Sequence, residues 1–188
     1  MRSAYKTKKS HVIFGYTTLL FCFMVLFGCQ SKKQSPLSPA AAAFKKEVQQ
    51  AIGMLAGALI DPVSKSNVAV INATLKKTMP ESIKLCRACP FMIAILDRKG
   101  MVLTVYPPKK EYSRHYTQYK LVIQALDRGE ACHGQLFLQD GSKLYTICVP
   151  LQKENKTVGV IVLTTTEEEV KQRWGMSEQE FLAIDFNQ

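Results

Sequence analysis

The sequence lacks the short motifs by which many enzymes are recognised. It contains no nucleophile elbow, no P-loop, no HExxH pair and no dinucleotide-binding fingerprint. Acidic residues are also few, since 15 Asp and Glu stand against 25 Lys and Arg. We therefore expect neither an enzymatic activity nor a bound cofactor. The basic residues are spread along the chain, which does not predict a surface for nucleic acid.

Residues 1–28 contain no acidic residue at all. Four basic residues, Arg2, Lys6, Lys8 and Lys9, precede an uncharged apolar run at 12–28. A positive start followed by such a run is typical of a secretory signal. The run is close to the lower limit of about 17 residues for crossing a bilayer, so an uncleaved membrane anchor is the alternative.

The apolar run ends in "LFGC" at 26–29, which resembles the lipobox of bacterial lipoproteins. In that family a diacylglyceryl group is attached to the cysteine, the preceding peptide is removed, and the new N-terminus is acylated. The resemblance implies a signal peptide at 1–28 and lipidation of Cys29. It also implies a place in the cell envelope, anchored to a membrane and facing the periplasm or the exterior. Residues 29–43 follow as a flexible tether rich in Ser, Pro, Ala and Lys.

Beyond the tether, the apolar pattern predicts one α+β domain over residues 44–188. Phe44, Val48, Ile52, Leu55 and Leu59 share one helical stripe, and Pro62 is expected to end that helix. Short turns join the last three strands, so the sheet should be largely antiparallel. The expected helices are 44–59, 68–80, 116–129 and 167–186, and the expected strands are 90–97, 101–106, 132–139, 143–151 and 157–166.

Three segments together resemble the Cache family of extracytoplasmic sensor domains, whose fold is PAS-like. They are "LDRKGMVLTVYP", "YSRHYTQYKLVIQALDRG" and "GQLFLQDGSKLYTICVPLQKENKTVGVIVLTT". The resemblance spans residues 91–166 and implies a five-stranded antiparallel sheet with a long N-terminal helix and flanking helices. Cache domains bind small molecules, often amino acids, carboxylates or amines, on the sheet under the loop and helix that follow the second strand.

This resemblance implies a pocket that includes Tyr112, Arg114 and Tyr119, with His133 and Tyr145 joining from the sheet. The chemistry of these residues suits the role. A guanidinium group binds a carboxylate through two parallel hydrogen bonds, and a tyrosine offers an apolar wall with a polar end. The alternative is that the tyrosines are ordinary packing residues and that Arg114 is a surface charge.

Four cysteines remain beyond the tether, Cys86, Cys89, Cys132 and Cys148, and an even number outside the cytoplasm suggests disulfides. A three-residue turn at 139–141 would place Cys132 directly opposite Cys148, whereas a two-residue turn would place them on opposite faces of the sheet. The CxxC at 86–89 allows three interpretations: a structural disulfide, a redox-active pair, or part of a metal or iron–sulfur site completed by the other two cysteines. The connectivity stays open.

These observations predict a lipid-anchored, extracytoplasmic domain that binds a small molecule. We expect no kinase, receptor or cyclase segment in this protein, so that a signal would pass to a separate membrane partner through the N-terminal and C-terminal helices. Two alternatives remain: a redox or metal protein built on the four cysteines, and a structural envelope lipoprotein.

Overall fold

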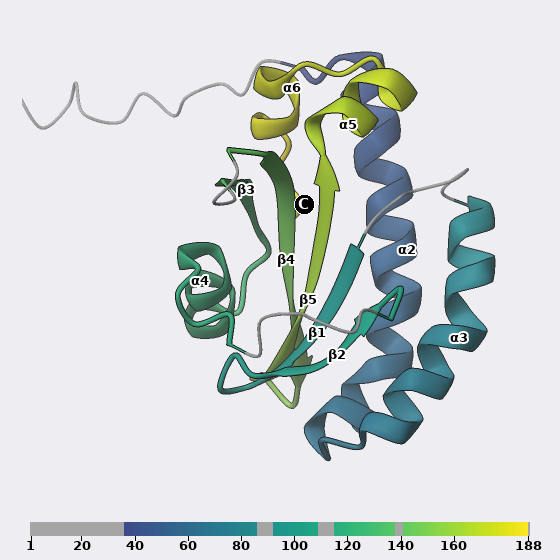
Figure 1. The fold of residues 1–188 in the computed structure, drawn as a ribbon, viewed down its shortest axis with the longest axis vertical. Coiled ribbons are helices and arrows are strands. Elements are labelled where there is room, and N and C mark those ends of the chain that lie inside the picture. Colours follow the sequence, from purple (N-terminus) through teal and green to yellow (C-terminus); the bar gives the residue numbers. More distant parts are fainter. Residues whose placement is uncertain (1–35, 86–91, 109–114, 138–140, 188) are drawn as a thin grey trace, which may run out of the picture. The chain divides into compact units, whose positions relative to one another are not determined.

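The computed structural model describes residues 36–85, 92–108, 115–137 and 141–187. Its centre is a five-stranded antiparallel sheet in the order β2-β1-β5-β4-β3 (Figure 1). The strands are β1 (Met92–Asp97), β2 (Val102–Tyr106), β3 (Cys132–Phe137), β4 (Lys143–Lys153) and β5 (Lys156–Thr166). The α+β class, the number of strands and their antiparallel pairing therefore agree with the sequence-based prediction.

Two long helices, α2 (Pro39–Ser64) and α3 (Val68–Leu85), lie on one side of the sheet, and α4 (Lys120–Arg128) lies on the other (Figure 1). The predicted stripe of α2 is confirmed, since every residue expected on it is buried. The ends of this helix were predicted wrongly. It begins at Pro39, with Ser38 as its N-cap, and it continues through Pro62.

Both proline positions have a physical explanation. Proline is tolerated in the first turn of a helix, where its missing N–H would have no partner in any case. Pro62 lies in the last turn, where Val63 is buried in the core and Lys65 N–H still donates to Asp61 O at 3.3 Å. Burial of Val63 therefore keeps the last turn helical despite the hydrogen bond that Pro62 removes.

The C-terminal segment forms two short helices where one helical tail was expected. They are α5 (Glu167–Trp174) and α6 (Glu178–Leu182), separated at Gly175, which has a φ of 64°. The predicted capping box is present at the start of α6. Glu180 N–H donates to Ser177 Oγ at 3.3 Å, and Ser177 N–H donates to Glu180 Oε2 at 2.8 Å.

The sheet has an apolar core on each side. We call the side packed against α2, α5 and α6 the α2 face, and the side packed against α4 the α4 face. Ile95, Ile147 and Ile161 lie on the α2 face, while Leu96, Cys148 and Val160 lie on the α4 face. This double covering explains why the strands do not alternate cleanly between apolar and polar residues.

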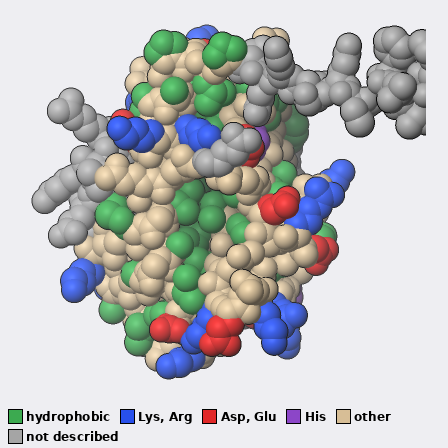
Figure 2. Space-filling model, turned by 180° about the vertical axis from the view of Figure 1, so that it is seen from behind, with side chains coloured by type: hydrophobic (Ala, Val, Ile, Leu, Met, Phe, Trp, Pro, Cys, Tyr) green, Lys and Arg blue, Asp and Glu red, His purple; other side chains and the backbone are tan. Residues whose placement is uncertain are grey.

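One face of the domain carries most of its charged side chains near its edges (Figure 2). On the side shown in Figure 2, charged side chains lie mainly around the rim and along the lower edge, while the middle is apolar or uncharged. Among the helices of the described residues, none combines the length and apolar composition needed to cross a bilayer.

Candidate functional site

The described residues include three of the five that were predicted to bind a ligand. Tyr119, His133 and Tyr145 are described, whereas Tyr112 and Arg114 lie outside the described residues. Cys29, Cys86 and Cys89 also lie outside them. The site is therefore built here from the sheet and α4.

Tyr119 lies on the α4 face, at the position directly before α4. Its ring meets the ring of Tyr116 edge to face, with a centroid separation of 5.2 Å. Tyr116 is buried, and burial raises its pKa, with a smaller contribution from neighbouring Tyr119. The Tyr116 hydroxyl therefore keeps its proton at neutral pH and can act as a hydrogen-bond donor.

His133 and Tyr145 were expected to join Tyr119 from the sheet, and their positions correct that expectation. Tyr145 is buried on the α2 face and stacks on Phe181 of α6, with ring centroids 4.5 Å apart. The His133 ring packs against Phe181 and Phe186, and its Nε2 lies 3.1 Å from Leu182 O.

The physical reason is the two-residue period of a strand. Tyr145 and Cys148 are three residues apart on β4, so their side chains point to opposite faces of the sheet. The pairing of Cys132 with Cys148 likewise sends His133, the next residue of β3, to the α2 face. The structure therefore does not bring His133 and Tyr145 together with Tyr119.

Threonine side chains, which the sequence analysis did not select, supply polar groups to the α4 face. Thr146 of β4 pairs with Gly134 on one side and with Thr164 of β5 on the other. Thr146 is 1% exposed, and its Oγ1 has no hydrogen-bond partner among the described residues. Thr164 Oγ1 donates to Met92 O at 3.3 Å.

The start of α4 packs closely against β3 on the α4 face of the sheet. A Cβ built on Gly134 would stand 3.3 Å from Leu121 Cδ1, so the glycine allows α4 to approach β3. A polar threonine two residues before Cys148 in an otherwise apolar strand was the available signal for this site. Thr146 therefore places an unpaired hydroxyl on the face that carries Tyr116 and Tyr119.

The register predicted for the β3–β4 hairpin with a three-residue turn is confirmed, because Cys132 lies directly opposite Cys148. Both are free thiols in the structure. Burial raises the pKa of the Cys132 thiol and raises that of Cys148 more strongly. Both thiols therefore stay protonated at neutral pH, whereas a redox-active cysteine has a lowered pKa.

Metal ligation finds no support in the part of the chain that the structure describes. No three His, Cys, Asp or Glu side chains there come together in a way that could hold a metal ion.

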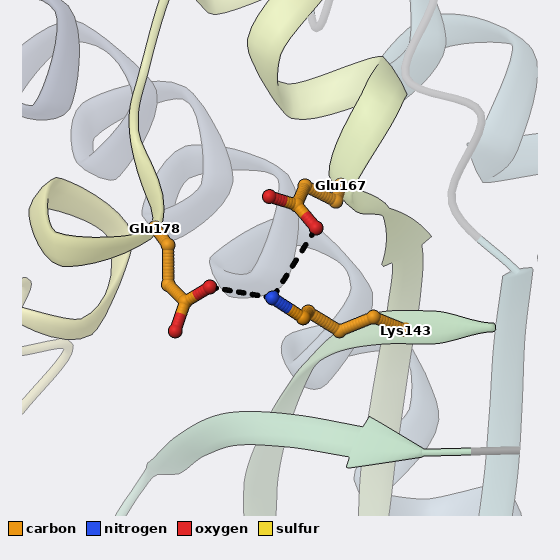
Figure 3. A network of polar contacts seen from close by, with 3 residues as sticks. All are labelled: Lys143, Glu167 and Glu178. Atoms are coloured by element: carbon orange, nitrogen blue, oxygen red, sulfur yellow. Dashed lines mark hydrogen bonds and ion pairs between the residues drawn. The ribbon is translucent and has the colours of Figure 1, made fainter. Parts of the chain in front are cut away.

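A separate polar network lies at the end of the sheet nearest α5 and α6 (Figure 3). Lys143 Nζ lies 2.6 Å from Glu178 Oε2 and 3.3 Å from Glu167 Oε2. The hydrogen bond from Lys143 lowers the pKa of Glu178, and the two carboxylates raise the pKa of Lys143. This network ties the start of β4 to both C-terminal helices.

Comparisons with known proteins give matches among solved structures only. No family model matches the chain, and no curated protein matches it. A domain of a sensory box/GGDEF family protein from Vibrio parahaemolyticus aligns over 74% of this chain at 15% identity, with a TM-score of 0.51. The sensor domain of the histidine kinase DctB from Vibrio cholerae aligns over 87% at 16% identity, with a TM-score of 0.46.

A third match is the ligand-binding domain of the amino acid chemoreceptor PctC from Pseudomonas aeruginosa PAO1, solved in complex with GABA. It aligns over 71% of this chain at 12% identity, with a TM-score of 0.43. This chain spans 60%, 62% and 58% of the three structures in the order given, less than two-thirds of each. With its five-stranded antiparallel sheet and flanking helices, the chain shares the fold of the Vibrio parahaemolyticus domain, which is the PAS-like fold expected from the sequence.

Proposed function

We propose that this chain is a lipid-anchored, extracytoplasmic sensor domain that binds a small carboxylate or amine on the α4 face of its sheet. The observation that carries the proposal is the unpaired hydroxyl of Thr146, buried on the same face as Tyr116 and Tyr119. A bound ligand would alter contacts with a separate membrane partner through α2 and the C-terminal helices.

The energetics of Thr146 favour a ligand. A buried polar group without a partner destabilises the folded state by about 1–3 kcal/mol, which a hydrogen bond from a ligand would recover. The edge-to-face tyrosine pair offers an apolar wall with hydroxyl groups beside it. Arg114, in the segment between β2 and α4, is proposed to bind the carboxylate through its guanidinium group.

A thermal-shift screen of amino acids, carboxylates and amines tests this proposal. A ligand present at about 100 times its Kd stabilises the folded state by about 2.7 kcal/mol, which raises the melting temperature measurably. We expect the gain to be lost in Arg114→Ala and reduced in Thr146→Val. No gain with any compound of these classes would contradict the proposed function.

Tyr145→Phe is the matched control for Thr146→Val, because the Tyr145 hydroxyl is also buried without a partner among the described residues but lies on the α2 face. We expect this variant to keep the full ligand-induced gain. Equal losses in Tyr145→Phe and Thr146→Val would mean that the site does not lie on the α4 face.

The lipid anchor is proposed from the sequence around Cys29. Several acyl chains on one residue hold a protein firmly at a membrane, because each buried methylene contributes about 0.8 kcal/mol. We expect Cys29→Ser to abolish incorporation of labelled palmitate and to block removal of residues 1–28, measured by mass spectrometry. Wild-type protein that keeps residues 1–28 and takes up no palmitate would instead indicate an uncleaved anchor.

A further inference from the structure

A cleft of about 270 Å³ opens at the end of the sheet where the β1–β2 and β4–β5 turns lie. Three separate parts of the chain line it: the β1–β2 turn, the last turn of α4, and the β4–β5 hairpin. In Figure 1 these turns are at the bottom, and in Figure 2 charged side chains gather along the corresponding lower edge. The residues that carry the argument are Arg98, Asp127, Arg128, Gln152, Lys156 and Thr157.

The lining of the cleft carries an excess of positive charge. Arg98, Arg128 and Lys156 each come from a different element, and Asp127 is the one acid among the lining residues. None of the three cations forms an ion pair with another described residue. With one acid against three cations, the lining carries an excess of two positive charges, which attracts an anion.

Neutral groups add polar contacts to the cleft. Gln152 Nε2 donates to Gly129 O at 2.8 Å and so occupies one carbonyl at the end of α4. The end of a helix carries a partial negative charge, which opposes an anion. The Gln152 hydrogen bond reduces this opposition, and the Thr157 hydroxyl at the same wall can donate to a ligand.

We propose that this cleft binds a small oxyanion with at least two negative charges, of the size of a phosphate or pyrophosphate group. Guanidinium groups match the oxygen atoms of such anions through paired hydrogen bonds, and a lysine adds a point charge. The site lies on turn residues and is independent of the ligand proposed for the α4 face.

Calorimetric titration of the purified protein with pyrophosphate, at constant ionic strength, tests this proposal. The variant Arg98→Gln/Lys156→Gln removes two of the three cations. The control Lys76→Gln/Lys77→Gln removes two exposed cations from α3, outside the cleft. Because each removed cation would otherwise make a charge-assisted hydrogen bond to the anion, we expect the cleft variant to bind about tenfold more weakly or worse, and the control to bind like wild type.

All the changed residues are exposed, so unchanged melting temperatures in chloride buffer would show that both variants fold. Absence of pyrophosphate binding at millimolar concentration would overturn the proposal, as would equal weakening in both variants. A second titration compares inorganic phosphate with glycerol 3-phosphate, the soluble headgroup of phosphatidic acid, because both can carry two negative charges. Tighter binding of the headgroup would assign the anion to a lipid, and tighter binding of phosphate would assign it to a free solute.

Discussion

Gly159 of β5 shows how one residue fixes the contact between the sheet and α2. A Cβ built at this position would collide with Leu96 O of β1 and would stand 2.5 Å from Val63 Cγ1 of α2. The backbone carbonyl cannot move without breaking the β1–β5 ladder. We expect Gly159→Ala to destabilise the domain by about 1–3 kcal/mol, measured by urea unfolding.

Gly57→Ala is the matched control for that substitution. Gly57 lies in α2, is exposed, and has no atom within 4 Å of a built Cβ. Since glycine disfavours a helix relative to alanine, we expect Gly57→Ala to stabilise the domain by about 0.5–1 kcal/mol. A loss of stability in both variants would show that the effect at Gly159 does not arise from its close contacts.

The ion pair between Lys143 and Glu178 predicts a dependence of stability on pH. The hydrogen bond from Lys143 lowers the pKa of Glu178 below its ordinary value of 4.5. A carboxyl group with a lowered pKa in the folded state stabilises that state above its ordinary pKa. Its contribution is lost as the pH falls through the lowered value. We therefore expect Glu178→Gln to unfold at lower urea concentration than wild type at pH 7, and the difference to shrink as the pH falls below 4.5.

Glu130→Gln provides the comparison, because Glu130 is exposed and takes no part in this network. Its unfolding midpoint should follow that of wild type across the same pH range. A gap between Glu178→Gln and wild type that does not shrink as the pH falls below 4.5 would mean that Lys143 does not stabilise the fold through the charge of Glu178.

At the scale of elements, the β3–β4 hairpin carries a prediction that depends on its register. Cys132 and Cys148 are directly opposite each other, and side chains in such pairs have Cβ atoms close to the separation that a disulfide needs. We expect mild oxidation with diamide to join these two thiols within one chain, as detected by mass spectrometry of proteolytic peptides. A disulfide that closes a loop of about 15 residues would stabilise the domain by about 3 kcal/mol.

Ellman's reagent applied to the native, reduced protein gives a second readout on this hairpin. Since Cys132 is partly exposed and Cys148 is buried directly opposite it, we expect the reagent to attack Cys132 first and Cys148 then to displace the thionitrobenzoate, closing the same disulfide. Peptides that join Cys132 to a residue other than Cys148 would contradict the pairing.

The elements also show how far the sequence could predict this fold. Five strands were predicted because short turns and β-branched runs are local signals, and the α2 stripe was predicted because its period is helical. The C-terminal end of α2 was missed because burial of Val63 outweighs the local effect of Pro62. Gly175 divides the C-terminal tail, since its φ of 64° ends α5.

The candidate site was harder to predict than the elements. Alternation along β4 separates Tyr145 from Cys148, but only the topology shows which face α4 covers. Thr146 was overlooked because a single threonine in an apolar strand resembles an ordinary β-branched core residue. Its importance follows from its lack of a partner, and this depends on the packing of neighbouring elements.

At the scale of the whole domain, Phe44 connects the two ends of the described chain. It lies in the second turn of α2 and is fully buried. Its ring meets Trp174 of α5 at 5.2 Å, Phe181 of α6 at 6.0 Å and Phe186 at 6.5 Å, each in an edge-to-face arrangement. The start of the long helix is thus held by the C-terminal segment, and both belong to the surfaces proposed to contact a membrane partner.

This arrangement predicts that Phe44→Ala disturbs the domain at both ends together. Removing a fully buried phenylalanine leaves a cavity and destabilises a fold by about 3–5 kcal/mol. Trp174 is the only tryptophan of the chain, so its fluorescence reports on this contact directly. We expect a lower urea midpoint and a tryptophan emission shifted to longer wavelength, because water reaches the indole.

Phe137→Ala, at a side chain that is 69% exposed, should change neither property, since substitutions at such surface sites usually alter stability by less than about 0.5 kcal/mol. An unchanged emission spectrum in Phe44→Ala would show that α5 is held in place without α2, and the two ends would then respond to a ligand separately.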